Sequence, residues 1–260
     1  MTEPIQPFSN SPISGSPCAD EAVLSPLACT TGVFYRPTRV FESLTRRPSW
    51  WMPFLVTMVV IGLFYFAVTA KVGWHQVYEN NLRLAPKQAQ QMENLTPEQR
   101  ASSEKVAVGF TQGIWLGMPL LTLLFAAIEA AILLGTINFV FGGRATFWQV
   151  YAVTWYAGLP GLLKFLLAIL ALFVGLDPES FQINNPAGTN LGYYLSPTDT
   201  PKAFYTLASQ VDLLMLWTLV LMGIGLAVVA RTKRSAGLMA VFAWWIVIVL
   251  LSVGATAAFS

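Results

Sequence analysis

Charged residues and histidine are scarce in this chain. Only 11% of its 260 residues are Asp, Glu, Lys or Arg, and its formal net charge is +2. An ordinary soluble domain carries roughly a quarter charged residues. The sequence has no Lys/Arg run and no zinc-ligand spacing, so nucleic acid is not an expected partner. A single histidine, His75, argues against histidine-based metal or acid–base chemistry.

Catalytic motifs are missing as well. The sequence holds no glycine-flanked serine nucleophile, no HExxH and no paired carboxylates. Its two cysteines, Cys18 and Cys29, both lie in the polar N-terminal part, so no disulfide framework is expected to hold a core. We therefore expect a protein that is not an enzyme, with no cofactor and no bound metal.

Hydrophobic residues, by contrast, make up 55% of the chain and gather in long segments. Crossing a bilayer takes about 20 apolar residues in a helix. Segment length and the absence of strand-like alternation favour helices over a barrel. The predicted fold is an all-α membrane protein with five transmembrane helices, at about 49–70, 108–141, 145–175, 211–230 and 236–258.

Composition divides the chain into two parts. Residues 1–32 are rich in proline and serine, which predicts a disordered tail, and residues 33–260 form the five-span membrane domain. Between Phe34 and Leu44 apolar residues fall on one side and arginines flank them. This pattern predicts an interfacial helix on an anionic leaflet; the alternative is a short cap packed on the helix bundle.

Two further helices are expected in the polar regions. Thr96, Pro97 and Gln99 form a capping box with proline at the first helical position, so a helix should start there and run into the second span. A short helix is also expected over Pro201 to Gln210.

The third span is interrupted by Gly158, Pro160 and Gly161, which predicts a broken helix. Residues 145–158 either enter the bilayer or lie along its surface, and both alternatives stay open.

Orientation follows from the short turns. One turn holds Arg144 and the other holds Arg231, Lys233 and Arg234, with no acidic residue in either. Lys and Arg accumulate on the cytoplasmic side of membrane proteins. We therefore predict that the N-terminus is inside and the C-terminus outside, in a bacterial inner (plasma) membrane.

Three ionisable residues fall within or at the edge of the apolar segments: Glu129, Lys164 and Asp212. Such residues are costly in lipid and usually face a partner or a wet cavity. Counted from the inside arginines at about 1.5 Å per residue, Lys164 and Asp212 share a level about 30 Å away, and Glu129 lies at about 22 Å. The three form a predicted buried-charge cluster, either a structural ion pair or part of a solute pathway.

Three threonines lie on the same side of the second span as Glu129. Thr111, Thr122 and Thr136 are separated from it by whole heptads or five helical turns. They predict a polar packing stripe against a neighbouring helix.

Three fragments together resemble the Yip-one-type (Ypt/Rab-interacting protein) domain family, in its bacterial integral membrane form. They are GVFYRPTRVFESLTRRPSWWMPFL, FGGRATFWQVYAVTWYAGLP and VDLLMLWTLVLMGIGLAVV, in the family's order. The resemblance implies five spans with a cytosolic N-terminal region, and association with Rab-type GTPases by family analogy. It also implies structural roles for the motif positions Pro37, Phe41, Gly143, Pro160, Asp212 and Trp217.

Two functions follow as expectations. The first is a non-enzymatic protein that organises membranes or acts as an adaptor, with the lipid bilayer, a protein partner or a second copy as its contacts. The alternative is a small-solute or ion transporter or channel that uses Glu129, Lys164 and Asp212.

Overall fold

The computed structural model describes residues 23–258, so Cys18 and most of the predicted tail lie outside the described residues. Within this range the chain is helical and contains no strand beyond one isolated bridge. Its α-helices are α1 (Pro26–Gly32), α2 (Pro37–Arg46), α3 (Trp51–Lys71), α4 (Trp74–Arg83), α5 (Pro86–Glu93), α6 (Pro97–Gly135), α7 (Phe147–Ala157), α8 (Leu162–Val174), α9 (Lys202–Gln210), α10 (Leu213–Ala230) and α11 (Arg234–Ala258). Short turns of other helix types are the π-helix η1 (Thr136–Val140) and the 3₁₀ helices η2 (Leu159–Gly161), η3 (Pro178–Ser180) and η4 (Leu191–Tyr194).

Five helical stretches in the described part are long and apolar enough to cross a membrane. They are Trp51–Lys71, Pro97–Val140, Phe147–Val174, Leu213–Ala230 and Arg234–Ala258. The predicted all-α fold with five such helices is therefore confirmed.

The second stretch starts well before the predicted span. Thr96 Oγ1 accepts the Gln99 N–H at 3.4 Å and Gln99 Oε1 accepts the Thr96 N–H at 3.1 Å, which completes the predicted capping box. The 39 residues of α6 measure about 58 Å at 1.5 Å per residue. Since the hydrocarbon core is about 30 Å thick, the polar first turns extend beyond it.

The third stretch consists of α7, the 3₁₀ turn η2 and α8. Every residue of α7 from Val150 to Ala157 is buried. This helix is apolar on all sides, and such helices are stable only when they are enclosed. It contacts α2, α6 and α10, so protein covers it.

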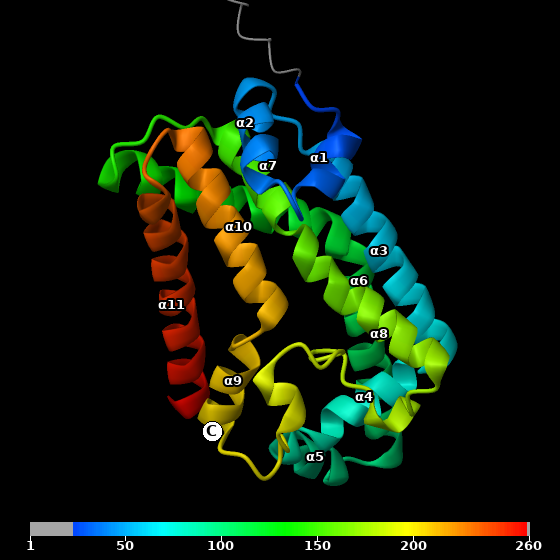
Figure 1. The fold of residues 1–260 in the computed structure, drawn as a ribbon. Helices are drawn as coiled ribbons and strands as arrows, with labels where there is room; N and C mark the ends of the chain where they lie inside the picture. The colour runs from blue at the N-terminus through cyan, green and yellow to red at the C-terminus, as the bar shows by residue number, and fades with distance from the viewer. Residues whose placement is uncertain (1–22, 259–260) are drawn as a thin grey trace, which may run out of the picture.

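The helices pack as two neighbouring groups (Figure 1). In one group α3 lies against α8, and in the other α10 contacts α11, α7 and α2. The larger apolar core joins α2, α7, α10 and α11, and a smaller one joins α3, α4, α8 and the loop after α8. Helix α10 is thus the central element of the larger core.

Glycine permits the closest approach in this core. A Cβ added at Gly237 of α11 would lie 2.2 Å from the backbone oxygen of Gly223 in α10. The two backbones therefore touch, as small residues allow in membrane helix pairs.

The helix at residues 37–46 corrects the predicted interfacial helix. Val40, Phe41 and Leu44 are buried in the bundle rather than turned toward lipid. Phe41 packs over Gly225 of α10, where an added Cβ would lie 2.9 Å from the Phe41 ring. The alternative, a cap packed on the bundle, describes α2.

The predicted tail over residues 1–32 extended too far into the chain. Pro26–Gly32 forms α1, because Ser25 Oγ accepts the Ala28 N–H at 3.2 Å and proline occupies a first-turn position. Cys29 is buried between α1 and the bundle. Burial raises the pKa of its thiol above the ordinary value of 9.0, against a hydrogen bond with Ser43 that lowers it.

Candidate functional site

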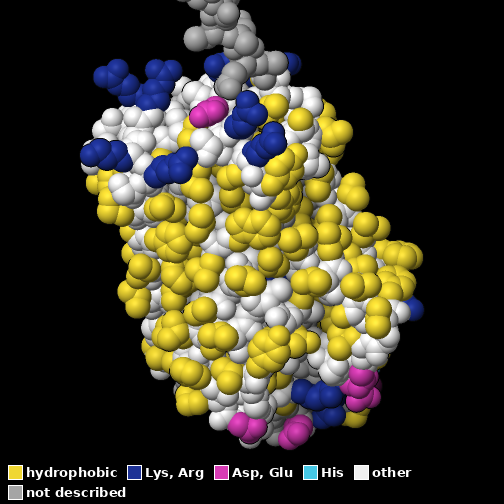
Figure 2. All heavy atoms as spheres, in the orientation of Figure 1, with side chains coloured by type: hydrophobic (Ala, Val, Ile, Leu, Met, Phe, Trp, Pro, Cys, Tyr) yellow, Lys and Arg dark blue, Asp and Glu magenta, His cyan; other side chains and the backbone are white. Residues whose placement is uncertain are grey.

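Basic side chains gather at one end of the bundle. Figure 2 shows Lys and Arg around the end that carries α2 and the α10–α11 turn, an apolar middle, and a mixed-charge opposite end. The basic residues of this end are Arg36, Arg39, Arg46, Arg47, Arg144, Arg231, Lys233 and Arg234. Among the described residues of these segments the one acidic residue is Glu42.

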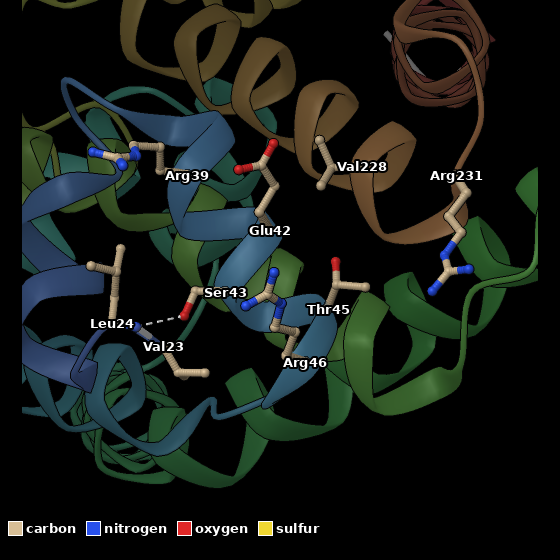
Figure 3. Close-up of a pocket in the computed structure, with 9 residues that line it drawn as sticks. All are labelled: Val23, Leu24, Arg39, Glu42, Ser43, Thr45, Arg46, Val228 and Arg231. Atoms are coloured by element: carbon tan, nitrogen blue, oxygen red, sulfur yellow. Dashed lines mark hydrogen bonds between the residues drawn. The ribbon is translucent and has the colours of Figure 1, made fainter. Parts of the chain in front are cut away.

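A groove of about 590 Å³ lies at this basic end (Figure 3). Arg39, Glu42 and Arg46 line it from α2, and Arg231 lines it from the end of α10. In Figure 3 Glu42 points from α2 toward α10, while Arg39 and Arg231 lie on opposite sides. We call these four residues and the space between them the basic groove.

Hydrogen bonds fix the walls of the basic groove. The Leu24 N–H donates to Ser43 Oγ at 2.9 Å, which holds the chain before α1 against α2. Gln149 Nε2 donates to the Thr45 carbonyl at 2.8 Å, and Arg234 Nη2 donates to Thr38 Oγ1 at 3.3 Å. Helix α2 is therefore attached to both α7 and α11.

Arg231 adopts an unusual backbone conformation, with φ 56° and ψ 41°. This is the left-handed region, which non-glycine residues enter at a cost. The conformation ends α10 and starts the short turn into α11.

A buried ion pair joins two of the three predicted charges. Lys164 Nζ, near the start of α8, lies 2.6 Å from Asp212 Oδ2, immediately before α10. The Lys164 side chain is 25% exposed and that of Asp212 is 5% exposed. Taking two charges out of water is expensive, and the remaining lone pairs of such a pair need hydrogen bonds.

Asp212 has those hydrogen bonds. Its Oδ1 accepts the N–H groups of Leu214 at 2.9 Å and Met215 at 3.2 Å, so it caps α10. Its Oδ2 accepts the Thr189 hydroxyl at 2.7 Å. Burial raises the pKa of this carboxyl, but the bonds from Lys164, Thr189 and Met215 outweigh burial and hold the pKa below its ordinary value of 3.8.

Glu129 lies apart from this pair. It lines a separate, mostly apolar pocket of about 340 Å³ between α6, α10 and α11, together with Gln210 and Trp245. Glu129 forms no ion pair with any residue in the range 23–258. The structure thus brings together Lys164 and Asp212 and leaves the third charge in another pocket.

The threonines of α6 bond mainly within their own helix. Thr111 and Thr122 donate to the carbonyls of Ala107 and Pro119. Thr136 donates to the Ile132 carbonyl and accepts the Trp244 indole N–H at 2.8 Å, which links η1 to α11. Thr136 is the member of the predicted stripe that bonds a neighbouring helix.

The family-motif positions occupy structural places. Pro37 begins α2, and Pro160 lies in η2. Trp217 packs edge-on against Phe34, with ring centroids 5.6 Å apart. A Cβ at Gly143 would lie 2.9 Å from Ala230 Cβ, so this turn touches the end of α10.

Sequence reasoning missed a polar pocket at the opposite end. It has a volume of about 370 Å³ and is lined by α4, α9, α11 and the loop between α8 and α9, with Lys164 at one wall. No residue spacing in the sequence predicts this pocket, because its lining residues come from segments far apart in the chain. The role of Asp212, by contrast, had a signal in the sequence. It directly precedes an apolar run, which is typical of an N-cap.

These features define the class of protein. Five apolar helices, the enclosed helix α7 packed on the central helix α10, and one basic end are typical of a polytopic α-helical integral membrane protein. No group of three or more His, Cys, Asp or Glu residues suited to a metal ion occurs within residues 23–258.

Comparison with known families identifies the class more closely. The Yip1 domain matches residues 31–255, most of the chain. The chain therefore belongs to the Yip1 domain family, a family of membrane proteins not known for enzymatic activity. No curated protein and no solved structure matches the chain.

Proposed function

We propose that this protein is a non-enzymatic membrane organiser that works through its basic end, with that end at the cytosolic leaflet. The observation that supports this proposal is the separation of charge along the bundle (Figure 2). Eight Lys and Arg residues stand at the end that carries α2, and Glu42 is the acidic residue described beside them. By the positive-inside tendency this end faces the cytosol, and the C-terminal end of α11 then faces the outside. The membrane of the proposal is the inner membrane of a bacterium.

Anionic headgroups suit this end electrostatically. A basic residue near an anionic membrane surface contributes about 1 kcal/mol of attraction. Arg36, Arg47 and Lys233 are exposed there, so the three together contribute about 3 kcal/mol. Because α2 is fixed to the bundle, attraction to lipid acts on the whole helical domain.

The basic groove extends the proposal to a protein partner. A groove of about 590 Å³ with three arginines and one glutamate fits an acidic side chain on a partner surface. By analogy with the Yip1 family, a GTPase is the first protein partner to test.

Lipid demixing tests the proposal directly. The full chain would be reconstituted in vesicles of phosphatidylcholine containing a minority of phosphatidylglycerol, part of it carrying a self-quenching dye. We expect wild-type protein to concentrate the anionic lipid and quench the dye. A variant with Arg36, Arg47 and Lys233 changed to Gln should lose at least half of this quenching.

A matched variant with Arg83, Lys87 and Arg100 changed to Gln removes the same charge from the opposite end. It should quench like wild type. Equal quenching by both variants, or none by wild-type protein, would refute lipid organisation through the basic end. Labelling of a cysteine introduced at exposed Tyr35, in a variant without the two native cysteines, separately tests the orientation when intact and opened cells are compared.

We do not extend the proposal to transport by Glu129, Lys164 and Asp212. Glu129 takes no part in the ion pair, and it lines a different pocket from Lys164, although Gln210 lines both.

A further inference from the structure

The polar pocket opposite the basic end has the size and lining of a ligand site. Its volume of about 370 Å³ falls within the range of roughly 300–1,000 Å³ usual for small-molecule sites. Residues of α4, α9, α11 and the loop between α8 and α9 form its walls. In Figure 1 α4 and α9 lie at the end of the bundle away from α2, so this pocket and the basic groove are separate places.

The charge of the pocket is positive. Lys164 and Lys202 line it, and no Asp or Glu is among the lining residues. Asp212 neutralises the charge of Lys164, whereas Lys202 forms no ion pair with any residue in 23–258. One positive charge is therefore left uncompensated.

Lys164 still has donors to offer a ligand. An ammonium group has three N–H donors, and the bond to Asp212 uses one. Its side chain remains 25% exposed, and it lines the pocket. An anion there would meet Lys202 and the remaining donors of Lys164.

A buried hydroxyl provides a second, independent observation. Ser209 is a lining residue of the pocket, and its Oγ is buried against Gly192 of η4 and has no hydrogen-bond partner within the described chain. Buried polar atoms in native proteins are nearly always hydrogen-bonded, and leaving one unpaired costs about 1–3 kcal/mol. Rotation of the Ser209 side chain away from Gly192 would let this hydroxyl bond a polar atom of a ligand in the pocket.

Side-chain amides complete the lining. Asn81, Gln182 and Gln210 line the pocket, and amide groups both donate and accept hydrogen bonds. The neighbouring Asn190 is fixed, since its Nδ2 donates to Asn185 Oδ1 at 2.6 Å and its Oδ1 accepts the Tyr193 N–H at 3.0 Å. The wall is therefore preorganised, and free amides suit the hydroxyls of a ligand.

We propose that this pocket binds a singly charged anion that carries hydroxyl groups, with a phosphodiester of a polyol as its chemical type. A phosphodiester has one negative charge, which matches the one uncompensated lysine, whereas a phosphomonoester carries about −1.5 to −2 at neutral pH. Lysine binds phosphate as a point charge. The phosphodiester belongs either to a free solute or to the headgroup of a membrane lipid.

Binding to the full chain in nanodiscs of phosphatidylcholine tests the free solute. Calorimetry would be carried out with glycerophosphoglycerol, a soluble phosphodiester, and with glycerophosphocholine, whose choline cancels the charge. We expect saturable binding of the first and at least tenfold weaker binding of the second. Raising the ionic strength should weaken the binding.

Three variants relate the binding to this pocket. Lys202→Gln should raise Kd at least tenfold, and Ser209→Ala should raise it about two- to tenfold, the range for one hydrogen bond. Lys87→Gln removes an exposed lysine of α5 outside the pocket and should leave Kd within twofold of wild type. Each variant should unfold at the wild-type midpoint without ligand, which separates lost binding from lost folding.

Nanodiscs that contain phosphatidylglycerol distinguish the lipid source. If a headgroup fills the pocket, phosphatidylglycerol raises the unfolding midpoint of wild type but not of Lys202→Gln, and it competes with glycerophosphoglycerol. If a free solute fills it, the soluble probe binds and the lipid has no effect. The proposal is overturned if neither glycerophosphoglycerol nor phosphatidylglycerol binds. It is also overturned if Lys202→Gln binds glycerophosphoglycerol as tightly as wild type does.

Discussion

Removing Lys164 should destabilise the bundle by leaving a buried carboxylate unpaired. In Lys164→Met, Asp212 stays 5% exposed and loses its contact at 2.6 Å, while its bonds from Thr189, Leu214 and Met215 remain. Removing one partner of a buried ion pair lowers the free energy of unfolding by about 3–5 kcal/mol. Because Lys164 is 25% exposed, water can reach part of the gap, and we expect the lower end, about 3 kcal/mol.

Removing both charges should recover much of this loss. Asparagine caps helices about as well as aspartate, so Asp212→Asn keeps the start of α10. The double variant Lys164→Met, Asp212→Asn leaves no unpaired charge, and replacing a buried pair with neutral groups is often close to neutral. We expect the double variant to lose about 1 kcal/mol, a coupling of about 2 kcal/mol or more.

Reversible unfolding in mixed detergent micelles, followed by tryptophan fluorescence, measures these values. Lys87→Met serves as control and should lie within about 0.5 kcal/mol of wild type, as surface changes usually do. A loss below about 0.5 kcal/mol in Lys164→Met, or additive losses in the double variant, would refute the assignment of a stabilising buried pair.

The pair also predicts a pH dependence. The pKa of Asp212 is lowered in the folded protein, so its contribution to stability is present above the ordinary value of 3.8 and is lost as the pH falls through the folded pKa. Wild type and Asp212→Asn should therefore converge in stability at strongly acidic pH and differ at neutral pH.

Three further predictions concern packing and reactivity. Gly237→Ala places a Cβ 2.2 Å from a backbone oxygen of α10 and should cost about 1–3 kcal/mol, whereas Gly254→Ala, with no atom within 4 Å, should be neutral or stabilising in the same unfolding assay. Phe41→Ala should cost about 3–5 kcal/mol because the ring is fully buried, while Tyr35→Ala, 68% exposed, should change stability little. Cys29, buried and with a raised thiol pKa, should react with maleimide at pH 7 much more slowly in the folded than in the denatured protein, as read by mass spectrometry of its peptide.

Local rules predicted the helices well. The five apolar segments are long enough to identify without any tertiary information. The start of α6 was predictable because Thr96, Pro97 and Gln99 form a capping box from four successive positions. Counting about 1.5 Å per residue from the arginines also placed Lys164 and Asp212 at one level, and the structure joins them.

Counting did not predict which of the three charges would pair, and Glu129 stays outside the ion pair. Between Glu129 and Arg144 the chain passes through the π-helix η1 and a non-helical turn. Both change the angular position of the residues, so the direction in which Glu129 points could not be carried across them. The docking of α2 was equally hidden, because it depends on Gly225, far along the chain.

The polar pocket required the fold itself. Asn81, Lys164, Gln182 and Lys202 are separated by long stretches of sequence, and each alone resembles an ordinary solvated polar residue. Only the folded loop between α8 and α9 brings them to one place. It is held by Asn80 Nδ2, which donates to the carbonyls of Pro178 and Phe181 at 2.8 Å each.

Arg231, the residue with left-handed backbone conformation at the end of α10, belongs both to the α10–α11 turn and to the basic groove. Arg231 both reverses the chain toward α11 and supplies a wall of the basic groove. A rotation of its backbone would tilt the last membrane helix and displace the guanidinium at the same time. The direction of α11 is thereby coupled to the position of one wall of the basic groove. Under the proposed function, an acidic partner that binds this arginine would change the tilt of a helix whose other end lies at the opposite end of the bundle.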